Sequence, residues 1–134
     1  MEICNNTNIP VIANLKLSIQ ANDKKVDATL FKRIVGSLRY VCNSRLDISY
    51  GVGMVSRFMS DLIQSHLATA KHILCYLKGT ADFGLFFPKK SDSTDGVLRA
   101  WSYSDWCGDQ VDRKNTYGYL FKYMGAPISW CSKK

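Results

Sequence analysis

Hydrophobic and polar positions divide the chain into a helical part followed by a β-rich part. Residues 1–26 are polar and show no sustained period, so they predict a connector with little regular structure, whose segment 9–17 docks on another part of the protein. From residue 27 apolar side chains recur at helical spacing, and beyond residue 80 the spacing changes to that of strands. The pattern therefore predicts an α+β fold.

Three helices are predicted between residues 27 and 80. Asp27 and Asp47 are placed to cap the first two, the third begins after Ser65, and Gly79 stands where a left-handed C-cap belongs. Glycines within the second helix, such as Gly51, are interpreted as permitting close helix packing. The predicted apolar stripes are, in chain order, Leu30, Ile34, Leu38 and Val41; Ile48, Val52, Val55 and Met59; and Leu67, Ala70, Leu74 and Leu77.

Four strand-like runs follow the helices. Phe83 to Phe87 form a short apolar run, and "VLRAWSYS", "TYGYLFKY" and "APISWCS" predict an antiparallel meander whose second connection, "MGA", is a tight turn. Such a meander leaves an open edge and one face that needs cover. The predicted organisation is a connector (1–26), a helical region (27–80), a strand with a linker (81–96) and the meander (97–134).

Composition predicts a folded protein and leaves two interpretations of its charge, a polyanionic partner or an ordinary basic surface. The chain has 134 residues, of which 46% are hydrophobic and 12% aromatic, enough to bury a core. The formal net charge of +7 favours nucleic acid, although scattered basic pairs are also typical of an ordinary solvated surface. Five cysteines without C-x-x-C spacing indicate reduced thiols and an intracellular protein, in cytoplasm or nucleus. We expect no signal peptide and no membrane partner, because the N-terminus lacks a basic region and long apolar stretches are absent.

The acidic residues of the β-rich part are best compared with the active site of a two-metal nuclease. Such a site needs three or four carboxylates that converge on two metal ions. If the strand that includes 97–104 continues through 105, Tyr103 and Asp105 share one of its faces, which makes Asp105 the nearest candidate ligand. Asp109 and Asp112 fall in the following turn, where turn formation is preferred over metal binding.

Histidines and aromatic residues offer two further possibilities. His66 and His72 are six residues apart, about 240° around a helix, so we interpret them as solvated or half-buried side chains and not as a metal pair. Aromatic residues of the meander alternate with basic ones, which fits a stacking surface for single strands or a sheet core, and the core is preferred. These residues are Trp101, Tyr103, Trp106, Tyr117, Tyr119, Phe121, Tyr123 and Trp130, with Arg99, Arg113, Lys114 and Lys122.

Four blocks of sequence resemble the end of the Pol polyprotein of copia-type long-terminal-repeat retrotransposons. The blocks are "FKRIVGSLRYVCNSRLDISYGVGMVSRFM", "SHLATAKHILCYLKGT", "SDWCGDQVDRKNTYGYLF" and "GAPISWCSKK", in the order of that family. The resemblance implies that the helical region is the thumb-like tail of a reverse transcriptase. It also implies that the meander is the start, here truncated, of an RNase H-like fold.

Departures from the family pattern bear on catalysis. The family's strand typically reads Y-S-D-S-D-W-x-G-D, whose first aspartate the resemblance marks as a metal ligand, and Tyr103 stands in its place. Asp105 matches the second aspartate. The remaining RNase H carboxylates follow "SWCSKK" in the family, and the polymerase aspartates precede this region. We therefore expect neither a catalytic residue nor a bound metal, although the intact family uses magnesium.

These observations predict a catalytically inactive remnant that keeps weak nucleic-acid binding. One alternative is a protein-interaction or effector-like module derived from the element, and another is an RNA–DNA hybrid ribonuclease active only with a complementing chain. The expected partners are an RNA–DNA hybrid or other nucleic acid, or an intact polyprotein chain. The residues expected to contact phosphates are Arg39, Arg57, Lys71, Lys78, Arg113 and Lys114.

Overall fold

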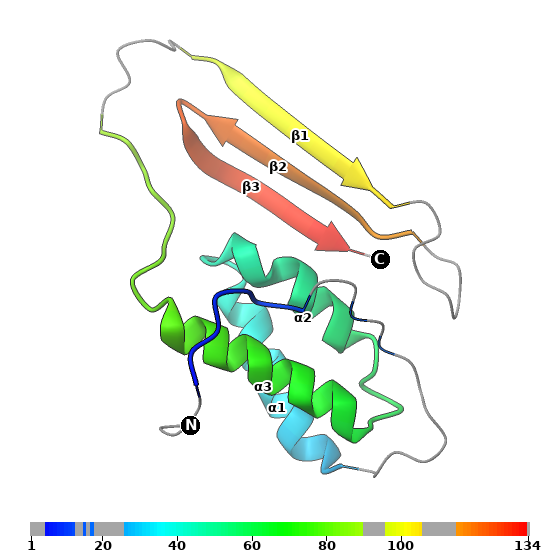
Figure 1. Cartoon of the computed structure of the whole chain (residues 1–134). Helices are drawn as coiled ribbons and strands as arrows, with labels where there is room; N and C mark the ends of the chain where they lie inside the picture. Colours follow the sequence, from blue (N-terminus) through cyan, green and yellow to red (C-terminus); the bar gives the residue numbers. More distant parts are fainter. Residues whose placement is uncertain are drawn as a thin grey trace. The chain divides into compact units, whose positions relative to one another are not determined.

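The protein has an α+β fold of three α-helices and a three-stranded antiparallel sheet. The computed structural model describes residues 5–12, 15, 17, 26–89, 96–105 and 115–133. The chain forms two compact units, Met1–Phe83 with the helices and Gly84–Lys134 with the sheet (Figure 1). Among the described residues, no helix has the length and apolar character needed to cross a bilayer.

Helix α1 (Ala28–Val41) begins at the predicted cap. The backbone N–H groups of Thr29 and Leu30 donate to the Asp27 carboxylate at 2.8 and 3.3 Å, which satisfies two of the orphan donors at a helix start. The predicted stripe is wrong at its first position, because Phe31 enters the core and leaves Leu30 42% exposed. The buried face is therefore Phe31, Val35 and Leu38, at the spacing i, i+4, i+7.

The second helical segment differs from the prediction at both ends. A short 3₁₀ turn, Leu46–Ile48, precedes α2 (Ser49–Ser56), and no side chain caps either element. The prediction that Asp47 is an N-cap is wrong, because the Asp47 carboxylate bonds the Arg45 guanidinium instead. Helix α2 ends before the predicted stripe residue Met59. The backbone N–H groups of Arg57 and Phe58 donate to the carbonyl oxygens three residues earlier, which tightens the last turn.

Helix α3 (Gln64–Gly79) ends without the predicted left-handed glycine. Its C-cap is Thr80, with φ −126° and ψ 38°, and the Thr80 hydroxyl donates to the Tyr76 carbonyl oxygen at 2.8 Å. The hydroxyl therefore bonds one of the last carbonyl groups of the helix, which backbone N–H groups would have bonded in a left-handed glycine cap. At Gly79 an added Cβ would lie 3.0 Å from Cβ of Asn6, so close passage of the N-terminal segment explains the small residue.

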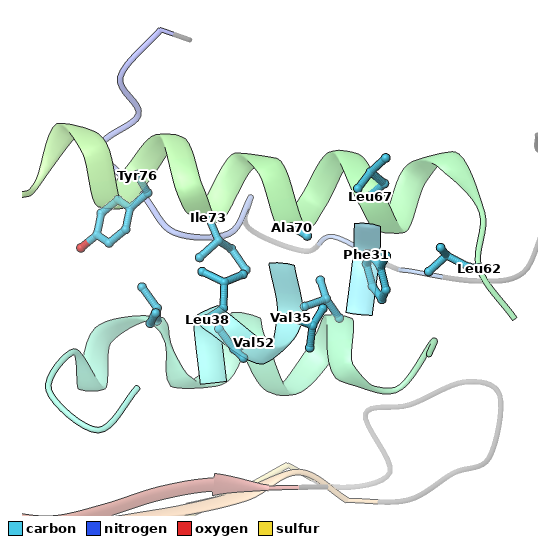
Figure 2. Packing of buried hydrophobic residues seen from close by; sticks show 11 residues of the cluster. Phe31, Val35, Leu38, Val52, Leu62, Leu67, Ala70, Ile73 and Tyr76 are labelled. Carbon is cyan, nitrogen blue, oxygen red and sulfur yellow. The ribbon is translucent and has the colours of Figure 1, made fainter. Parts of the chain in front are cut away.

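A hydrophobic core joins the three helices, as Figure 2 shows. Full burial of one large apolar side chain contributes about 1.5–3 kcal/mol. At Gly51 an added Cβ would lie 2.4 Å from Val11 Cγ2 and 3.3 Å from Ile73 Cδ1, which confirms that this glycine permits close packing. Val11 and Leu17 pack against the core, which confirms the predicted docking of the 9–17 segment at these two residues, whereas Ile9 and Ile12 are exposed. The core residues are Phe31, Val35, Leu38, Ile48, Val52, Val55, Leu62, Leu67, Ala70, Ile73 and Tyr76.

The sheet of the second unit follows the predicted meander. Strands β1 (Leu98–Ser104), β2 (Tyr117–Tyr123) and β3 (Ala126–Lys133) pair antiparallel in the order β1-β2-β3 (Figure 1). Met124 and Gly125 form the two-residue turn between β2 and β3, with φ of 49° and 82°. Positive φ at both positions is the requirement of a type I′ hairpin, and it explains the glycine.

The predicted strand at residues 83–87 is wrong. This segment has no strand assignment, and Phe83, Phe86 and Phe87 are 62%, 78% and 62% exposed. Apolar composition alone favoured a strand, but a strand also needs a neighbour that receives its backbone hydrogen bonds. Each paired strand of the described sheet finds its partners within residues 98–133.

Candidate functional site

Tyr103 occupies the strand position at which the resemblance places a metal-binding aspartate. It lies opposite Gly118 on β2, which in turn lies opposite Ser132 on β3. A Cβ on Gly118 would lie 2.3 Å from Tyr103 Cε1, so the phenol ring rests against the glycine. The Tyr103 hydroxyl and the Ser132 hydroxyl are 2.7 Å apart and form a hydrogen bond. Tyr103 therefore bridges all three strands.

Asp105 closes the end of the β1–β2 ladder. Its backbone N–H donates to the Thr116 carbonyl oxygen at 2.9 Å, and its carboxylate accepts the Thr116 N–H. The nearest candidate metal ligand is thus engaged with the backbone that joins β1 and β2. Among the described residues, no group of three or more His, Cys, Asp or Glu side chains could hold a metal ion. Asp109 and Asp112 lie outside the described residues.

The two histidines have different environments. His66 has no exposed surface, and its ring stacks on Phe58 with centroids 3.8 Å apart, so the prediction of a solvated or half-buried His66 is wrong. The spacing of His66, Ala70 and Ile73 places all three on the core face of α3, and that signal was present in the sequence. His72 is half-buried as predicted, and its Nε2 lies 3.0 Å from the Ile9 carbonyl oxygen.

Four of the predicted phosphate-binding residues belong to the helical unit. Lys71 and Lys78 are exposed on α3 and seven residues apart, which places them on one side of the helix about 10.5 Å apart along its axis. Arg39 is exposed in the last turn of α1, and Arg57 is half-buried at the C-cap of α2. The two remaining predicted residues, Arg113 and Lys114, lie outside the described residues.

A buried arginine organises the polar contacts of the helical unit, and sequence reasoning missed it. Arg45 is 8% exposed and forms a two-pronged ion pair with Asp47, Nε to Oδ1 at 3.0 Å and Nη2 to Oδ2 at 2.7 Å. Its other donors reach Thr80 after α3, at 2.8 Å to the carbonyl and 2.7 Å to the hydroxyl. The Tyr76 hydroxyl donates to Asp47 at 2.7 Å. The R-x-D spacing was the available signal.

This Arg45 network shifts the pKa values of its members. Burial is the largest single influence on the pKa of Asp47 and raises it. The hydrogen bonds from Arg45 and Tyr76 together outweigh burial, so the pKa of Asp47 lies below its ordinary value. The pKa of the Tyr76 hydroxyl is raised by burial and then by its bond to the Asp47 carboxylate. The arrangement links the α1–α2 connection to the end of α3 and presents no unengaged nucleophile.

A cavity of about 280 Å³ in the helical unit lies next to this network. Asp47 is its charged lining residue and is already bonded to Arg45 and Tyr76. Because this carboxylate is satisfied and most other lining residues are apolar, the cavity offers little with which to orient a ligand. Its lining consists of Pro10, Val11, Ile12, Leu15, Asp47, Tyr50, Gly51 and Met54.

Most aromatic side chains of the sheet are exposed, against the preferred prediction that they form a core. Phe121 and Trp130 are half-buried, and Trp106 lies outside the described residues. Trp101 is 48% exposed, Tyr103 50%, Tyr117 48% and Tyr123 43%. A sheet buries aromatic rings only where another layer packs on its face. Every residue of β1 is exposed in the described structure.

Comparisons with known proteins identify the family. The chain is 42% identical over 125 residues to the retrovirus-related Pol polyprotein from transposon RE1 of Arabidopsis thaliana, an alignment that covers 93% of this chain and 8% of that protein. Its identity to the corresponding polyprotein from transposon RE2 of the same plant is 38%, with the same coverage. It is 39% identical over 101 residues to secreted RxLR effector protein 161 of Plasmopara viticola, covering 75% of this chain and 69% of that protein.

These similarities show that the chain belongs to the retrovirus-related Pol polyproteins of transposons. It spans about 8% of the length of the two Arabidopsis polyproteins that it matches. No family model matches the chain. No solved structure matches it either.

Proposed function

We propose that this chain is a non-catalytic part of a copia-type Pol polyprotein that binds nucleic acid weakly. In this proposal the helical unit corresponds to the thumb-like tail of the reverse transcriptase. The sheet corresponds to the opening strands of an RNase H-like domain. The similarity to Pol polyproteins of transposons supports the origin of both units.

The observation that carries the proposal is the structural use of Tyr103 and Asp105. Tyr103 provides a ring that covers Gly118 and a hydroxyl that bonds Ser132, where metal chemistry would need a carboxylate. The Asp105 carboxylate accepts the Thr116 N–H at Oδ1, which ties this side chain to the backbone at the end of the β1–β2 ladder. Catalytic metal sites tolerate errors of only about 0.5 Å in ligand placement. Moving a carboxylate by two strand residues, about 6.8 Å, exceeds that tolerance.

Binding is supported by the charge and by the exposed lysines of α3. The formal net charge is +7, and Lys71 and Lys78 lie on one side of the helix. Phosphate contacts of this kind position a protein on nucleic acid without reading sequence. A few such contacts give weak affinity that falls steeply with salt.

The experiment that tests binding compares two double variants on an RNA–DNA hybrid across a salt series. Lys71→Ala with Lys78→Ala should weaken binding and flatten the slope of log affinity against log salt by about 0.9 for each phosphate that is no longer neutralised, because fewer counterions are released. Arg33→Ala with Lys89→Ala is the matched control, since it removes the same charge from exposed positions elsewhere. Equal losses of affinity in the two variants would refute a defined binding surface on α3.

A protein-interaction role is the second candidate, and open strand edges favour it. Strands β1 and β3 each pair only with β2 in the described structure, so their outer backbone groups are available to another strand. A similar chain bears the name of a secreted effector. Mixing the protein with a full-length Pol polyprotein after nuclease treatment tests this role. A complex that survives without nucleic acid would support it, and co-elution that disappears on nuclease treatment would refute it.

A further inference from the structure

The sheet of the second unit combines positive charge with exposed aromatic rings. Its three strands contain Arg99, Lys122 and Lys133 and no acidic residue. They also contain seven aromatic residues among 22 positions, and several are about half exposed. Protein sheets that bind single-stranded nucleic acid combine these two features, because phosphates need cations and bases need flat rings.

Two of the three strand cations are paired across β1 and β2. Arg99 on β1 lies directly opposite Lys122 on β2, so both side chains leave the same face of the sheet. Like charges at directly opposed positions repel each other and destabilise the pair. The strands supply no carboxylate to relieve this repulsion. An anion held between Arg99 and Lys122 would relieve it.

Two aromatic rings continue this face along β1. Trp101 and Tyr103 follow Arg99 at two-residue steps, and the ammonium group of Lys122 lies 5.8 Å from the centre of the Trp101 ring. Tyr103 is held against Gly118 and by its hydroxyl bond to Ser132, yet it remains 50% exposed. A ring that is fixed before binding loses little conformational freedom when a base stacks on it.

We propose that this cationic face, consisting of Arg99, Trp101, Tyr103 and Lys122, binds single-stranded nucleic acid. Arg99 and Lys122 bind a backbone phosphate, and bases stack on Trp101 and Tyr103. The site is separate from the α3 lysines of the proposed function.

The spacing of the rings selects a single strand over a duplex. Residues two apart on one strand face are separated by about 6.8 Å. Successive nucleotides within one strand of a duplex are separated by about 3.4 Å. Bases on Trp101 and Tyr103 are therefore unstacked from each other, which an extended single strand allows and a paired helix does not.

The test measures binding of a fluorescein-labelled oligothymidine of about 12 nucleotides to the whole chain by anisotropy. Trp101→Ala should reduce the affinity roughly 5- to 150-fold, the effect of losing one stacked base, and Trp101→Phe should keep most of it. Tyr117→Ala is the matched control, because Tyr117 is equally exposed but lies opposite Ser104 on the other face of the sheet. It should leave the affinity unchanged.

A second variant keeps the test decisive if Trp101→Ala does not fold. Arg99→Gln with Lys122→Gln removes both charges and keeps two polar side chains, and it should flatten the salt slope for oligothymidine by about 0.7 for each phosphate that is no longer neutralised. Circular dichroism establishes the fold of each variant. The α3 double variant, measured on the hybrid, reports separately on the proposed function.

Two results would overturn this inference. One is an oligothymidine affinity that neither the Trp101 nor the Arg99/Lys122 variants change. The other is a change of mass in sedimentation caused by these variants while oligothymidine binding stays constant, because the face would then be covered by a second copy of the chain.

Discussion

At the residue scale, the contact between Tyr103 and Gly118 gives position 103 a structural role in place of the metal-binding role that the resemblance implies. The glycine leaves room for the ring, since a Cβ there would lie 2.3 Å from Tyr103 Cε1 and 2.7 Å from the Cys131 carbonyl oxygen. An aspartate at 103 would be too short to cover the glycine and reach Ser132. The pair therefore fits a role in holding the three strands together.

Gly118→Ala should destabilise the sheet unit by about 1–3 kcal/mol, because the added methyl group meets a backbone oxygen that cannot move independently. Urea unfolding followed by tryptophan fluorescence measures this loss selectively, since all three tryptophans belong to residues 84–134. Gly84→Ala is the control, because its added Cβ meets nothing within 4 Å. Similar stabilities of the two variants would contradict the packing described here.

Asp47 should make the stability of the helical unit depend on pH at the acid end. Its folded-state pKa lies below the ordinary value, so its contribution is complete above the unfolded-state pKa and is lost as pH falls through the folded-state pKa. The raised pKa of Tyr76 acts at the alkaline end. Its contribution to stability is complete below the ordinary pKa of tyrosine and is lost as pH rises through the folded-state pKa. Between these limits the Arg45 network is at full strength.

Comparison of wild type with Asp47→Asn isolates the acid effect. At neutral pH the variant should be less stable by about 1 kcal/mol, a charged hydrogen bond discounted because the Asp47 side chain is 32% exposed. The difference should shrink and disappear as pH falls through the folded-state pKa of Asp47, because a protonated aspartate has lost the same charge. Unfolding followed by far-ultraviolet circular dichroism measures both values. A difference that stays constant with pH would show that Asp47 carries no such linkage.

At the element scale, capping and turn chemistry were predictable because they depend on neighbouring residues. The Asp27 cap and the Met124–Gly125 turn both appear as predicted. The failed predictions depend on tertiary contacts. Asp47 pairs with Arg45 instead of capping a helix, Thr80 replaces Gly79 at a helix end, and the run at 83–87 has no pairing strand among the described residues.

Asp27→Ala should destabilise the helical unit by about 1 kcal/mol, because the N–H groups of Thr29 and Leu30 lose their acceptor. Asp27→Asn is the matched control and should retain nearly all of the stability, since asparagine caps about as well as aspartate. Urea unfolding followed by far-ultraviolet circular dichroism compares the two. Equal losses of stability in both variants would mean that the charge of Asp27, and not the cap, matters.

At the scale of the whole molecule, the α+β class and the meander order could be read from periodicity alone. The exposure of the sheet could not, because alternating aromatic residues fit a buried face and an open face equally well. The candidate site was predictable only in part. The sequence identified Tyr103 and Asp105, but the ring contact with Gly118 and the bond to Thr116 appear only when strand register is known.

The most direct test of the proposed function is cleavage of a labelled RNA–DNA hybrid by the purified protein in Mg²⁺ and in Mn²⁺, with binding followed on the same samples. We expect salt-dependent binding without cleavage in either metal, because Tyr103 and Asp105 serve the structure of the sheet. Metal-dependent cleavage that Asp105→Asn abolishes would contradict this account. Asparagine can still accept the Thr116 N–H, so such a loss would assign the Asp105 carboxylate to catalysis.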